Sequence, residues 1–145
     1  MNINELLSWL KNNGGTALPA ADIRDIQLAN NTLQTMKCPM LPNTLIELYQ
    51  NAGAIFVQDS HIFGPNAARA DGRLYEIPSI TEINRTMDGV LMFRGTLIFG
   101  RNGLFYFTAN TDGTANMLDI TTGAIAKKYC DVNAAIYDCL AGGRA

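Results

Sequence analysis

Side chains that could carry chemistry are concentrated in one short segment of a weakly charged chain. Charged residues make up 17% of the 145 residues, against about 25% in an average protein. Five of the 24 charged residues (11 basic and 13 acidic) and the single histidine fall between positions 59 and 76. Carboxylates, guanidinium groups and an imidazole could together serve acid–base chemistry or partner binding. The residues concerned are Asp59, His61, Arg69, Asp71, Arg73 and Glu76.

The spacing of these residues matches no catalytic or metal-binding signature. A zinc site needs three or four ligands at workable spacing, but the chain has one histidine, and Cys130 and Cys139 are far apart for a ligand pair. No Gly-x-x-x-x-Gly-Lys phosphate loop is present, and the turn at 110–113 lacks the later acidic ligands of a calcium loop. We therefore predict no catalytic residue, no cofactor and no metal, and no enzyme activity. A small hydrolase using Asp59 and Glu76 is the alternative.

The same segment is typical of a partner-binding loop. Residues 64–74 are rich in glycine, proline, asparagine and alanine, which predicts a loop longer than most hairpin turns. Loops on a rigid scaffold often carry binding residues, and arginine is a favoured anchor at protein interfaces. We therefore predict that the six residues named above contact a protein partner. The alternative is a solvated loop with no binding role.

Charge and composition exclude other classes of partner. The net charge is −2 and no basic stripe occurs, so we expect no nucleic-acid partner. No apolar run reaches the roughly 20 residues of a membrane helix, and the first residues lack the features of a signal peptide. Three cysteines at unrelated spacings favour reduced core thiols over a disulfide framework. We therefore expect a cytoplasmic protein that does not bind membranes.

Apolar periodicity predicts helices in the first half of the chain and a sheet in the second. Helices are expected at residues 3–13, 20–33, 42–52, 80–87 and 132–140. Strands are expected at residues 55–57, 61–64, 96–99, 104–107, 115–120 and 124–129, with Asn102-Gly103 in a tight hairpin turn. This pattern predicts a single α+β domain over 1–145, with N-terminal helices, an antiparallel meander sheet and a C-terminal helix packed on the sheet.

Alternation of aromatic residues predicts that the sheet has two different faces. Phe99, Phe105 and Phe107 share one face by strand period, and Tyr106 points to the other. If that second face is open, Tyr106 and Ile98 form an exposed apolar patch of the kind that binds partners. We expect the face to be covered.

The order of motifs resembles the SUKH superfamily, which includes fungal cell-wall assembly regulators and many bacterial immunity proteins. The resemblance covers roughly residues 20–140. One departure is Ala52-Gly53, where family members often carry Asn-Gly. The residues that carry it are Leu41-Pro42-x-x-Leu45-x-x-Leu48-Tyr49-x-x-Ala52-Gly53, Ile62-Phe63-Gly64 and Leu97-Ile98-Phe99-Gly100.

This resemblance implies an α+β domain without enzyme activity that acts by binding other proteins. Bacterial members commonly bind and neutralise the toxin domain of a polymorphic or contact-dependent toxin, and fungal members act in regulation. The expected function is therefore that of an immunity protein for a bacterial toxin domain, with a regulatory scaffold as the alternative. No functional residue carries over from the family, because its matching positions (Leu41, Pro42, Gly53, Gly64 and Gly100) are expected to cap helices and form turns.

Overall fold

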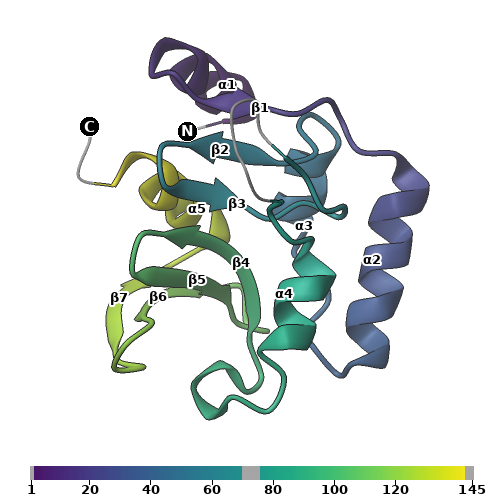
Figure 1. Cartoon of the computed structure of the whole chain (residues 1–145), viewed down its shortest axis with the longest axis vertical. Helices are drawn as coiled ribbons and strands as arrows, with labels where there is room; N and C mark the ends of the chain where they lie inside the picture. The colour runs from purple at the N-terminus through teal and green to yellow at the C-terminus, as the bar shows by residue number, and fades with distance from the viewer. Residues whose placement is uncertain (1, 70–75, 143–145) are drawn as a thin grey trace.

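The computed structural model of this protein is built around one antiparallel sheet (Figure 1). In residues 2–69 and 76–142, the part of the chain that the structure describes, seven strands lie side by side in chain order. This is the predicted meander. The strands are β1 (Thr16–Ala17), β2 (Ile55–Val57), β3 (Ser60–Ile62), β4 (Leu97–Asn102), β5 (Phe105–Ala109), β6 (Ala115–Asp119) and β7 (Ile125–Tyr129).

Helices precede, interrupt and follow the sheet. Three come before β2, α4 and a short 3-10 helix separate β3 from β4, and α5 ends the described chain. The predicted α+β fold class is therefore confirmed, including the C-terminal helix against the sheet. The helices are α1 (Ile3–Asn12), α2 (Ile23–Thr35), α3 (Asn43–Tyr49), α4 (Ile80–Thr86), η1 (Leu91–Phe93) and α5 (Val132–Ala141).

Side-chain caps set where most of these helices begin. Asn2, Asp22 and Asp131 each accept a hydrogen bond from a backbone N–H in the first turn of the helix that follows. At α4, Ser79 and Glu82 form the predicted capping box, in which each side chain accepts from the other residue's backbone N–H. These contacts are local in sequence, and for that reason the sequence reveals them.

Three details of the prediction are wrong. Ile23 was expected to face inward but is 61% exposed, because it directly follows the cap of α2 and the buried face runs through Ile26, Ala29 and Leu33. The thiols are core residues only in part, since Cys139 is buried, Cys38 is half-buried and Cys130 is exposed. The third helix is shorter than expected and ends at Tyr49.

The hairpin between β4 and β5 turns one residue later than predicted. Asn102 pairs with Phe105, so the two-residue loop consists of Gly103 and Leu104. Gly103 supplies the positive φ, 56°, that the turn requires. Arg101 and Asn102 therefore belong to strand β4 and not to the turn, and their side chains point to opposite faces of the sheet.

The two faces of the sheet have different neighbours. Helix α5 packs against strands β3 to β7 on one face (Figure 1), and the Cys139 Sγ atom lies there against Gly100. On the other face, the pairs of His61 with Arg101 and of Arg101 with Tyr106 place these three side chains in one cross-strand row. Tyr106 was predicted to point away from Phe107, and it does.

The three glycines of the family resemblance, Gly53, Gly64 and Gly100, have a different structural role from the one expected. A Cβ atom on Gly64 would lie 1.8 Å from the carbonyl oxygen of Gly53, and one on Gly53 would lie 2.7 Å from that of Pro19. At Gly100 a Cβ would meet the Cys139 Sγ atom at 3.1 Å. These three glycines allow close packing of backbone segments, and they do not form caps or turns.

Helix α4 is fixed to the sheet by a buried side-chain amide. Asn84 accepts from the Ile98 N–H at 2.9 Å and donates to the Ile98 carbonyl at 2.9 Å. It also donates to the Ile80 carbonyl at 2.8 Å. Because pairing of β3 with β4 ends at Ile62 and Gly100, the amide takes the place that a further strand residue would have beside Ile98. This contact sets where α4 and the residues just before it lie.

Candidate functional site

An open cavity of about 440 Å³ lies on the sheet face opposite α5. The β2–β3 turn, strands β3 to β5 and the segment from Glu76 to Ile83 surround it. Its charged and polar side chains are Asp59, His61, Glu76 and Arg101, and its apolar ones are Phe63, Ile77, Pro78, Ile83 and Tyr106. We call it the mixed-charge pocket.

The structure brings together three of the six residues that the sequence singled out. Asp59 and Glu76 are exposed at the pocket and His61 forms part of its wall. Arg69 is exposed but is not part of the lining. Asp71 and Arg73 lie outside the described residues. The charged segment 59–76 therefore contributes to the pocket wall through residues near its two ends.

The His61 side chain is held in the wall of the pocket. Its side chain belongs to the cross-strand row, and the residue is only 8% exposed. The imidazole ring packs edge-on against Phe63 with 5.0 Å between ring centroids, and it lies 6.5 Å from the Phe56 ring. These ring contacts fix its orientation, so its contribution to binding is a rigid, mainly apolar surface.

Arg101 lines the pocket and is the charged lining residue that sequence reasoning missed. Its Nε atom donates to the Gly103 carbonyl at 3.1 Å, and its guanidinium lies 5.5 Å from the centre of the Tyr106 ring. A planar guanidinium fixed by an aromatic ring and a carbonyl loses little entropy when it binds a partner. A signal was available, because residues two before and two after a two-residue turn pair across the hairpin. Placing the turn one residue too early hid it.

Tyr106 forms the floor of the pocket and is itself covered. Its ring meets that of Phe93 edge to face, with 5.5 Å between centroids, and the residue is only 4% exposed. Ile98, on the same face, is fully buried. The face is therefore covered at these two residues, as expected, because η1 and the Arg101 side chain lie over this part of the sheet. The pocket opens beside the part of the sheet that η1 and the Arg101 side chain cover.

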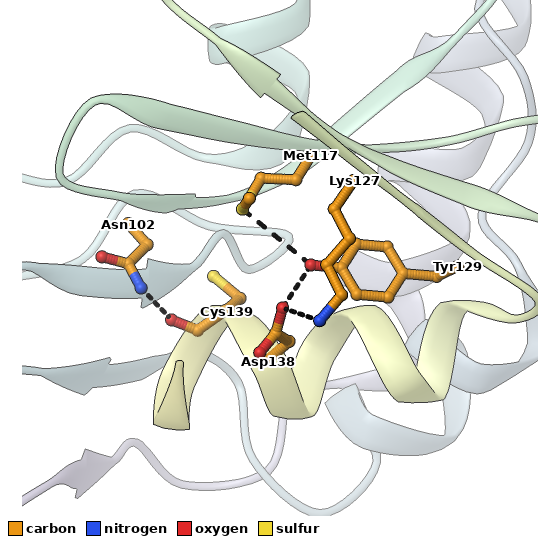
Figure 2. A network of polar contacts seen from close by, with 6 residues as sticks. All are labelled: Asn102, Met117, Lys127, Tyr129, Asp138 and Cys139. Carbon is orange, nitrogen blue, oxygen red and sulfur yellow. Dashed lines mark hydrogen bonds and ion pairs between the residues drawn. The ribbon is translucent and has the colours of Figure 1, made fainter. Parts of the chain in front are cut away.

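A polar network on the opposite face attaches α5 to strands β4 and β7 (Figure 2). The Lys127 Nζ atom and the Asp138 carboxylate form an ion pair at 3.2 Å, and the Tyr129 hydroxyl donates to the same carboxylate. Asn102, the neighbour of Arg101, donates to the Cys139 carbonyl at 2.9 Å. Burial and the contact with Asp138 raise the pKa of Tyr129 above its usual range, so this hydroxyl is a structural donor.

Two other features, a metal-ligand cluster and a membrane-spanning helix, are not found in the described residues. Within the described residues, no group of three His, Cys, Asp or Glu side chains is placed to hold a metal ion. In the same part of the chain, no helix combines the length and apolar character needed to cross a membrane. The pocket can therefore bind through one oriented cation, two exposed carboxylates and an aromatic floor.

Comparison of the chain with models of known protein families and with curated proteins yields no match in either case. The functional proposal therefore rests on the pocket and its residues.

Proposed function

We propose that this chain is a non-enzymatic, cytoplasmic protein-binding domain of SUKH type that acts as an immunity protein. It binds a bacterial toxin domain through the mixed-charge pocket and blocks that domain sterically. The observation that carries the proposal is Arg101, whose guanidinium is held over the buried Tyr106 ring at an open pocket. Arginine is among the residue types enriched at the energetic hot spots of protein interfaces.

The surroundings of this pair fit a specific protein interface. Fixing Arg101 in advance lowers the entropic cost of binding. Carboxylates of Asp59 and Glu76 beside one guanidinium create a charge pattern that matches only a complementary partner surface. Charged residues make up only 17% of the chain, so the three charges of this pocket would contribute strongly to discrimination between partners.

The positions that carry the SUKH resemblance lie in elements consistent with it. Leu41 and Pro42 precede α3, Gly64 follows β3, and Gly100 lies in β4 under the closing helix α5. The three glycine positions also share one physical constraint, close backbone packing. The placement of these elements supports the family proposal, whereas the glycines serve close packing and not the caps and turns that the resemblance implies. The family proposal does not depend on the pocket, and the two can fail separately.

Co-expression tests the immunity function. Cells that express a toxin domain encoded beside this gene should grow when the wild-type chain is present, and the two proteins should co-purify. Arg101→Glu should abolish rescue, because it reverses the one oriented cation of the pocket. Arg24→Glu, on the exposed surface of α2 and away from the pocket, is the matched charge reversal and should rescue like wild type. Absence of both rescue and complex would contradict the proposal.

A hydrolase is the second candidate, favoured by the presence of both Asp59 and Glu76 at one pocket. Paired carboxylates can act as acid and base on a bound substrate. Asp59→Asn with Glu76→Gln removes both groups and keeps their size. A hydrolase requires that this variant lose protection completely while the complex still forms. Protection that changes only in proportion to affinity would favour binding over catalysis.

A further inference from the structure

We infer that the partner presents an acidic side chain, Asp or Glu, to the guanidinium of Arg101. This inference rests on the proposed binding function and specifies the chemistry of the contact. Among the residues that the structure describes, the ion pair found is Lys127 with Asp138. Arg101 is half-buried, yet no carboxylate in that part of the chain pairs with it.

The contacts that Arg101 does make leave its best donors available. The carbonyl of Gly103 takes the Nε–H, and the Tyr106 ring supports the face of the group. The Nη atoms of a guanidinium form a planar fork that matches the two oxygens of a carboxylate. A half-buried cation held in this way gains most from a partner that brings such a carboxylate.

The two acidic side chains of the pocket, Asp59 and Glu76, restrict which acidic partner fits. Glu76 is exposed and lines the same cavity, so it repels an uncompensated anion. A partner loop that carries a basic side chain beside its acidic one satisfies Arg101 and Glu76 together. Phe63, Ile77 and Tyr106 supply apolar surface for the methylene groups of the incoming residues.

A side chain fits this pocket better than a chain terminus. C-terminal carboxylates are commonly captured by clusters of backbone N–H groups. Here the oriented donor at the pocket is the Arg101 side chain. The acidic group is therefore assigned to a surface loop of the partner.

Selection from a library of cyclic peptides displayed on phage tests this inference with the full chain. Wild type should enrich peptides with Asp or Glu next to Lys or Arg, and Arg101→Gln should not enrich them. Arg24→Gln is the matched control and should select the same peptides as wild type. The dissociation constant of one selected peptide, measured by fluorescence anisotropy, should rise roughly tenfold or more for Arg101→Gln. Arg101→Lys should recover only part of the loss, because it lacks the fork.

A change in the peptide keeps the test independent of protein folding. Replacing the peptide's Asp or Glu by Asn or Gln should weaken binding to wild type by a similar factor and leave binding to Arg101→Gln unchanged. Basic peptides that depend on Glu76 and ignore Arg101 would overturn the inference and leave the binding function standing. No enrichment by wild type would overturn it as well. Acidic peptides selected by a chain that fails to rescue any toxin would instead remove the immunity proposal alone.

Discussion

At the scale of single residues, two tyrosine hydroxyls are held in environments that keep them protonated. Tyr49 is fully buried and donates to the Phe63 carbonyl at 2.6 Å. Tyr129 donates to the Asp138 carboxylate beside α5. Burial raises the pKa of both phenols above the ordinary value of 10.0, and at Tyr129 the contact with Asp138 raises it further. The folded state therefore favours the neutral form of both side chains.

These two residues make the protein less stable in alkaline solution. Above about pH 10, unfolded tyrosine loses its proton while the folded protein retains it, so the free energy of unfolding falls as pH rises. Below that pH both states are protonated and the contribution is fully present. Urea unfolding from about pH 8 to pH 11 should show the decline. Tyr129→Phe should make the decline less steep, because one linked proton is removed; an equal slope in the variant would contradict the assignment.

At the scale of elements, one amide joins α4 to the sheet. Asn84→Ala removes the partners of the Ile98 N–H and carbonyl, which are buried. Each unsatisfied buried backbone group costs about 1–3 kcal/mol, so we expect a loss of about 3 kcal/mol in unfolding free energy, measured by urea denaturation.

Asn84→Asp separates the roles of the two amide atoms. The aspartate keeps an acceptor for the Ile98 N–H but places an oxygen against the Ile98 and Ile80 carbonyls, where the amide donated. It should be at least as unstable as the alanine variant at neutral pH. Because α4 carries Ile83 into the pocket wall, both variants should also bind the partner less well. A fully stable alanine variant would show that α4 is held by apolar packing alone.

The lack of a side chain at Gly64 allows its backbone segment to pass close to the segment that contains Gly53. Gly64→Ala would place a Cβ atom 1.8 Å from the Gly53 carbonyl oxygen, and neither backbone segment can move away cheaply. We expect a loss above about 3 kcal/mol, beyond the usual range for overpacking. Gly14→Ala is the control, because its Cβ meets no atom within 4 Å and only its φ of 74° is unfavourable, at about 1–2 kcal/mol. Similar melting temperatures for the two variants would contradict the close approach.

At the scale of the whole molecule, the features that could be predicted are those that depend only on residues adjacent in the sequence. The capping box of Ser79 and Glu82, the apolar face of α5 and the opposite orientation of Tyr106 and Phe107 need only a few adjacent positions, and these features formed as predicted. The fold class followed from their order.

Features that depend on distant contacts could not be predicted in the same way. The short β1 strand exists because Thr16 and Ala17 pair with β2. Asn84 acts on Ile98 across 14 positions, and nothing in its local sequence indicates that role. Of the ten residues that line the pocket, Asp59, His61 and Glu76 belonged to the predicted charged segment, whereas the role of Arg101 in the lining became visible only once the hairpin register was known.

Net charge determines how the whole molecule should approach its partner. At −2 the chain exerts little long-range attraction or repulsion, so association should proceed without electrostatic steering, at about 10⁵–10⁶ M⁻¹s⁻¹. Surface plasmon resonance with the co-purified toxin domain should show an association rate that changes little between about 0.05 and 0.5 M NaCl. Arg101→Gln should act mainly by raising the dissociation rate, because it removes a contact made only in the complex. Arg24→Gln should change neither rate. An association rate that falls steeply with salt, or that Arg101→Gln lowers more than it raises dissociation, would place the recognition in a long-range field and not in the mixed-charge pocket.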